Sequence, residues 1–160
     1  MNLDALVKKG LSPWRPSPGV RSVDVWHEYD VPTAGILDLP QGGILFTAMG
    51  DTDDRLSVWA YTCLTEDERS KLSGLQVTSV QELRELVDQI FEGREVVFAL
   101  ADNLIIDQWS PATVGNSLLE AASDFLSQVL KALENSRNPE ARFQARLAEV
   151  EAVTQELVEA

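Results

Sequence analysis

The chain contains one histidine, His27, and one cysteine, Cys63, two residue types often used as catalytic base and nucleophile. A neighbouring imidazole activates a thiol only when the two side chains come within hydrogen-bond reach. Each residue lies in a separate predicted strand, so strand pairing on one face of a sheet would have to join them. We expect a partly buried structural histidine and a small buried cysteine. The alternative is a small hydrolase or transferase that uses His27 with Cys63 or with a carboxylate.

Three aspartates, Asp51, Asp53 and Asp54, resemble the start of a calcium-binding loop. Such a loop also needs glycine at its sixth position and glutamate at its twelfth, where this chain has Leu56 and Thr62. The pattern therefore predicts an acidic turn. No glycine-rich segment leads into a helix with a phosphate-binding lysine, so we expect no metal, nucleotide or other cofactor.

Large aromatic residues on the predicted strands are more informative. Each buries on the order of 150 to 250 Å², and Trp and Tyr are typical anchors of protein interfaces. Two interpretations are open: the C-terminal helices cover these side chains in an ordinary core, or part of the aromatic face binds a protein partner. A narrow apolar stripe in the last predicted helix has the same two interpretations. The candidate partner-binding residues are Trp14, Trp26, Trp59, Tyr61, Phe143, Leu147, Val150 and Leu157.

The chain is strongly acidic: 26 acidic residues oppose 13 basic ones, which gives a formal net charge of −13. Direct nucleic-acid binding needs clustered lysine and arginine, and Lys8 and Lys9 form the only basic cluster. The sequence therefore disfavours a nucleic-acid partner. Acidity suits solubility, a basic protein partner, or an inhibitor that mimics DNA.

The compartment is predicted from what the sequence does not contain. A single cysteine forms no internal disulfide, which suits a reducing cytosol. No apolar run is long enough to span a membrane. A secretory signal has its positive charges before a long apolar stretch, whereas the N-terminal lysines of this chain follow a short one. We expect a cytoplasmic protein without a membrane partner.

The clearest strand is Arg55 to Leu64, which is apolar on both faces and therefore belongs inside a covered sheet. Alternating residues and short turns predict antiparallel neighbours on either side of it. The predicted strands are 21–31, 34–39, 44–49, 55–64, 94–101 and 104–109.

Helical periodicity and capping residues predict the remaining elements. Capping-box spacing begins two helices between the fourth and fifth strands, at Thr65 and at Ser79. Ser110 and Pro111 resemble the start of another helix, but Gly115 indicates that the regular part of this helix begins at about residue 117. The predicted helices are 1–10, 65–72, 79–91, 117–134 and 139–157.

Together these elements predict an α+β domain at residues 22–134. Its antiparallel sheet has five or six strands, formed by a meander and a hairpin, with two inserted helices and a C-terminal helical hairpin. Residues 1–21 form an extended N-terminal lead-in, because three prolines in eight residues prevent regular structure there. Residues 135–160 form a C-terminal helix that either packs on the domain or acts as an oligomerisation arm.

The strand Asp24 to Asp30, the hairpin after it, the segment Leu56 to Tyr61 and the helix start at Thr65 and Glu66 together resemble a group of uncharacterised bacterial α+β domains of unknown function. The likeness covers about residues 22 to 109. It implies a bacterial source and assigns no catalytic residue.

The sequence favours a non-catalytic protein-binding module. We expect an accessory or regulatory partner in a bacterial system, of the immunity or defence-associated type, that forms a homo-oligomer if the C-terminal helices associate. Its alternatives are the acidic DNA mimic and the small hydrolase or transferase.

Overall fold

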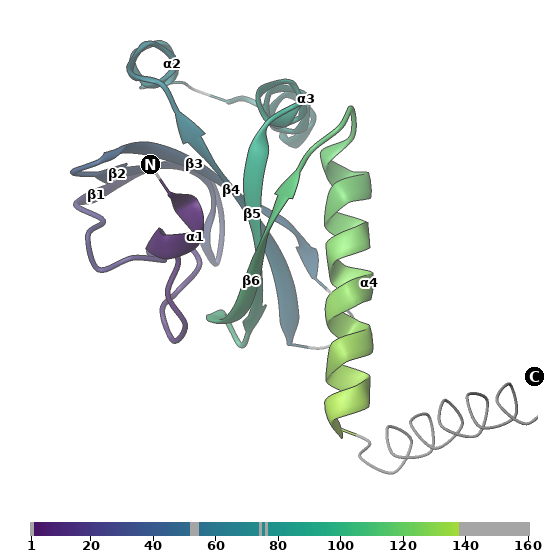
Figure 1. The fold of residues 1–160 in the computed structure, drawn as a ribbon. Helices are drawn as coiled ribbons and strands as arrows, with labels where there is room; N and C mark the ends of the chain where they lie inside the picture. The colour runs from purple at the N-terminus through teal and green to yellow at the C-terminus, as the bar shows by residue number, and fades with distance from the viewer. Residues whose placement is uncertain (1, 52–54, 74, 76, 138–160) are drawn as a thin grey trace, which may run out of the picture. The chain divides into compact units, whose positions relative to one another are not determined.

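A computed structural model of the chain describes residues 2–51, 55–73, 75 and 77–137 (Figure 1). The chain divides into two compact units, residues 1–125 and 126–160. The first unit contains the entire described sheet. Among the described residues, no helix combines the length and the apolarity needed to cross a membrane.

Six antiparallel strands follow one another in the order β1-β2-β3-β4-β5-β6, so each strand pairs with its neighbour in sequence. The predicted α+β fold with an antiparallel meander is confirmed, and the sheet has six strands in the described part of the chain. β4 lies inside the sheet, as its two apolar faces predict. The bounds are Ser22–Tyr29 (β1), Val31–Leu39 (β2), Gly42–Asp51 (β3), Leu56–Leu64 (β4), Glu95–Asp102 (β5) and Ile105–Thr113 (β6).

The described helices are Leu3–Leu6 (α1), Glu66–Leu72 (α2), Val80–Phe91 (α3) and Leu118–Arg137 (α4). The capping box that begins α2 is confirmed: the Thr65 hydroxyl accepts from the Glu68 N–H, and the Glu68 carboxylate accepts from the Thr65 N–H. At α3 only half of the predicted box forms. Ser79 accepts from the Glu82 N–H, whereas the Glu82 carboxylate bonds Thr78 and not Ser79.

Two predictions about helices were wrong. The N-terminal helix covers only Leu3–Leu6 and not residues 1–10. α4 begins at Leu118, as predicted, but Ser110 and Pro111 do not begin a helix, because β6 continues through them to Thr113, with Pro111 opposite Val97. β6 is an edge strand, and an edge position tolerates a residue that has no N–H to donate to a neighbouring strand.

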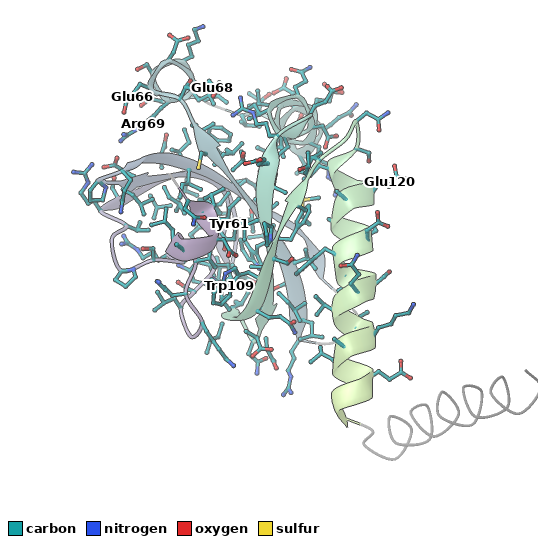
Figure 2. The ribbon with its side chains drawn as sticks, in the orientation of Figure 1. Tyr61, Glu66, Glu68, Arg69, Trp109 and Glu120 are labelled. Carbon is teal, nitrogen blue, oxygen red and sulfur yellow. The ribbon has the colours of Figure 1, made fainter. Side chains whose placement is uncertain are left out.

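The face of the sheet that carries Trp59 and Tyr61 is covered by the N-terminal segment. Leu3 and Val7 are buried in the same cluster as these two rings, and the Trp14 ring lies 6.2 Å from the Trp59 ring. The Tyr61 hydroxyl donates to the backbone carbonyl of Pro13 at 2.7 Å (Figure 2). Of the two interpretations, an ordinary core is the one found for these two rings, but the proline-rich lead-in supplies the cover and not α4. The last predicted helix, 139–157, lies outside the described residues.

The opposite face carries Val58, Ala60, Phe98 and Leu100, which are all buried. The Phe98 ring stacks on Phe125 of α4, with 5.5 Å between the ring centroids. α3 has a buried stripe of its own at Leu83, Val87 and Phe91.

Two ion pairs join α2 to the sheet. Arg69 pairs with Asp38 of β2, and Glu68 pairs with Arg94, which directly precedes β5 (Figure 2). Arg94 Nη1 also donates to the carbonyl of Cys63 at 3.0 Å. The four side chains of these two pairs are half-buried, so the pairs fix α2 at the point where β4 ends.

Candidate functional site

The two catalytic candidates lie far apart in the sheet. His27 is in β1 and Cys63 in β4, with two strands between them. At about 4.8 Å per strand, three intervals separate them by roughly 14 Å across the sheet. The residue of β1 that lies across the sheet from Cys63 is Val23, through the successive pairs at Ile44 and Leu37. His27 therefore also lies further along β1 than the position opposite Cys63. The structure therefore does not bring the imidazole and the thiol together, and the proposed thiol–imidazole pair does not form.

Each of these residues has a local structural role instead. The His27 Nδ1 lies 2.6 Å from the Thr33 hydroxyl, which itself donates to the His27 carbonyl at 3.0 Å. Since that hydroxyl proton is already used, Nδ1 is the donor in the first bond. Burial raises the pKa of the Cys63 thiol, while the positive charge of Arg94 acts in the opposite direction. A raised pKa keeps the thiol protonated at neutral pH, which is the opposite of nucleophile activation.

The aromatic candidates lie mainly in the core. Trp59 is 2% exposed and Tyr61 is fully buried, while Trp26 is buried and Trp14 is half-buried. In the folded state the two central rings therefore present no surface to a partner. The other four candidates lie outside the described residues: Phe143, Leu147, Val150 and Leu157.

One edge of the sheet is closed by the N-terminal segment. The backbone carbonyl of Ile106 in β6 accepts from the Gly10 N–H at 2.9 Å, and its N–H donates to the Leu11 carbonyl at 2.8 Å. Lys9 and Asp107 form an ion pair beside these bonds, with 3.6 Å between Nζ and Oδ1. The outward backbone groups of β6 at this point are therefore already satisfied within the chain.

The other edge, β1, is open among the described residues, because β2 is its only strand neighbour there. In an antiparallel sheet, half of the backbone groups of an edge strand point away from the sheet. Two apolar side chains on this strand are exposed: Val25 at 42% and Tyr29 at 77%. β1 therefore combines an unpaired backbone with exposed apolar groups.

The exposed charges along β1 are all negative. Asp24, Glu28 and the adjoining turn residue Asp30 are exposed and take part in no ion pair in the described part of the chain. The register shifts on both sides of His27, which indicates bulged pairing at Trp26 and His27. Simple alternation would place Val25, His27 and Tyr29 on one face of β1 and Trp26 on the other. The bulge interrupts this alternation at Trp26, which is buried, while Val25 and Tyr29 are exposed.

Sequence reasoning missed this edge as a site, although one signal was present. The first strand of a meander has no earlier strand to pair with, so it lies at an edge unless it is covered. Within the described ranges, no three His, Cys, Asp or Glu side chains converge as metal ligands. Comparison of the chain with models of protein families, with curated proteins and with solved structures finds no match.

Proposed function

We propose that the chain is a non-catalytic protein-binding module, of accessory or regulatory type, that binds its partner along the open edge of β1. The observation that carries this proposal is the contrast between the two edges. β6 is capped at Ile106 by the backbone of the N-terminal segment, whereas β1 presents Val25 and Tyr29 beside unpaired backbone. Exposed edges of this kind accept an added strand from another chain.

The charges of β1 favour a basic partner. Asp24, Glu28 and Asp30 would face lysine or arginine side chains of an added strand, and apolar residues of that strand would contact Val25 and Tyr29. Pairing of β1 with a second copy of itself would instead place carboxylates against carboxylates. Like charges opposite each other destabilise a strand pair, so a different protein is the favoured partner.

The proposal is tested first by photocrosslinking in the host cell. A photoreactive phenylalanine analogue replaces Tyr29, which is 77% exposed on β1, and in a matched control it replaces Leu119, which is 65% exposed on α4. We expect one protein to be crosslinked at position 29 and not at position 119. That protein is then purified and its affinity measured for the unmodified chain and for Val25→Asp.

We expect Val25→Asp to weaken binding at least about tenfold, since it removes an apolar contact and places a charge against apolar residues of the added strand, each costing roughly 1 kcal/mol. A rise from low to high salt should weaken binding further, because the contacts are charged. An unchanged affinity for Val25→Asp contradicts binding at β1. A crosslinked partner that is a DNA-binding protein, released by DNA in competition, would instead favour the acidic DNA mimic.

A further inference from the structure

α4 carries apolar side chains outside its buried face. The buried residues of this helix are spaced by four and three: Leu118, Ala122, Phe125 and Val129. A second apolar stripe lies roughly a quarter turn further round the helix and repeats the spacing. This second stripe consists of Leu126, Leu130 and Leu133, all in the second compact unit. Leu130 is 41% exposed and the other two are half-buried, so the stripe offers an apolar surface along the end of α4.

The chain that follows α4 has the same apolar spacing. α4 ends at Arg137, and residues 138–160 lie outside the described residues. In their sequence, Phe143, Leu147 and Val150 are again spaced by four and three. This spacing is typical of the seam between two helices, because residues four and three apart lie on one side of a helix. The second stripe and the segment after it therefore have matching apolar seams.

A reversal directly after α4 would bring the two seams together. Asn138 and Pro139 suit such a reversal, since proline has no N–H with which to continue the helix. Links of about two to five residues usually join antiparallel helices. Because both helices rise about 1.5 Å per residue, residues equally far from the link face each other. To within one residue, the facing pairs are Leu133 with Phe143, Leu130 with Leu147, and Leu126 with Val150.

We propose that residues 139–157 form a helix that folds back antiparallel to α4 and covers the second stripe of the same chain. A short link holds the segment beside its own α4 at an effective concentration of roughly millimolar order, which favours this chain over a second copy. The last predicted helix is then an internal partner of α4 and not an oligomerisation arm. This inference does not depend on the proposed binding of a protein at β1.

Hydrogen exchange followed by mass spectrometry tests whether the segment is packed. A single helix without tertiary contacts is marginal in water, so its amides are protected only when one side packs. We expect the amides of residues 139–157 to exchange at least about tenfold more slowly in the full chain than in a synthetic peptide of residues 138–160. Leu130→Asp should remove most of this protection, because it places a charge in the apolar seam.

The matched control places the same charge on another side of the same helix. Gln128 is exposed and lies about 200° round α4 from Leu130, so Gln128→Asp should leave the protection of residues 139–157 unchanged. The amides of β4, in the middle of the sheet, verify in the same experiment that each variant is folded. The comparison of the unmodified chain with the peptide needs no variant.

A cysteine pair identifies the chain that supplies the cover. With Cys63 replaced by serine, Leu130→Cys is combined with Leu147→Cys, and Gln128→Cys with Leu147→Cys is the control pair. A disulfide needs Cα atoms within about 7 Å, which facing seam positions provide. We expect the first pair to form a disulfide within one chain at least about tenfold faster than the control pair.

Three results would each overturn the proposal. The first is exchange of residues 139–157 in the unmodified chain as fast as in the peptide. The second is an equal effect of Leu130→Asp and Gln128→Asp on this exchange. The third is a disulfide between positions 130 and 147 that forms mainly between two chains, which would assign the cover to a second copy.

Discussion

The hydroxyl of Tyr61 joins the centre of the sheet to the N-terminal segment, and its removal tests whether that segment is part of the core. Tyr61 is fully buried, and its hydroxyl donates to the buried Pro13 carbonyl at 2.7 Å. Tyr61→Phe keeps the ring and leaves that carbonyl without its donor. Leaving a buried polar group unsatisfied costs about 1 to 3 kcal/mol, so we expect the free energy of unfolding to fall by this amount.

Urea unfolding followed by tryptophan fluorescence measures the effect. With an m-value of about 2 kcal/mol/M, the midpoint should fall by about 0.5 to 1.5 M, and the melting temperature by roughly 2 to 12 °C. Tyr29→Phe is the matched control, because Tyr29 is 77% exposed. A Tyr61→Phe midpoint that equals that of Tyr29→Phe would refute the assignment of the N-terminal segment to the core.

The remaining predictions concern pH and packing. Burial raises the pKa of Tyr61 well above its usual value near 10, so the unfolded chain releases this proton first. The contribution of the protonated Tyr61 to the free energy of unfolding is complete below about pH 10. It is lost as the pH rises further, by up to about 1.4 kcal/mol per pH unit. In Tyr61→Phe, urea unfolding at several pH values should show no such loss. Gly35→Ala should destabilise the chain by about 1 to 3 kcal/mol, because its Cβ would lie 2.0 Å from the Asp24 carbonyl oxygen in β1. Gly115→Ala is the control, because a Cβ there meets no atom within 4 Å, and its melting temperature should change by less than about 2 °C. Equal falls in melting temperature for the two glycine variants would contradict this packing of β1 on β2.

Local sequence signals predicted the helices and strands well where these depend on interactions between residues that are close in sequence. Alternation located all six strands, and the Thr65 cap located α2 within a residue or two. The predicted strands 94–101 and 104–109 leave Asp102 and Asn103 for the β5–β6 turn, whereas the left-handed residues are Asn103 and Leu104. A leucine with positive φ is uncommon, so residue type alone could not locate this turn.

The covering of the two faces could not be predicted from the sequence, because it depends on contacts between distant segments. Pro13 and Tyr61 are 48 positions apart, and no local pattern indicates that the first carbonyl accepts from the second side chain. The proline-rich composition of the lead-in predicted an extended segment, and the structure has turns at residues 9–19, where the Arg15 N–H donates to the Ser12 carbonyl and the Val20 N–H to the Ser17 carbonyl. This composition gave no information about which face of the sheet that segment covers.

The candidate sites were predicted least well, for a related reason. Cys63 was considered with His27, whereas the sheet places it beside Arg94 and Glu95, which follow it in sequence after the two inserted helices, α2 and α3. The open edge of β1 was identified only after the strand order was known. Both features depend on topology, which residue types and spacing do not determine.

The most direct test of the central claim is the affinity of the crosslinked partner for the chain with and without Val25→Asp. We predict that this change on the open edge of β1 weakens binding at least about tenfold, while Leu119→Asp, at the exposed position on α4, leaves the affinity unchanged. Equal affinities for the unmodified chain and Val25→Asp, with a loss only in Leu119→Asp, would contradict the assignment of the binding surface to β1.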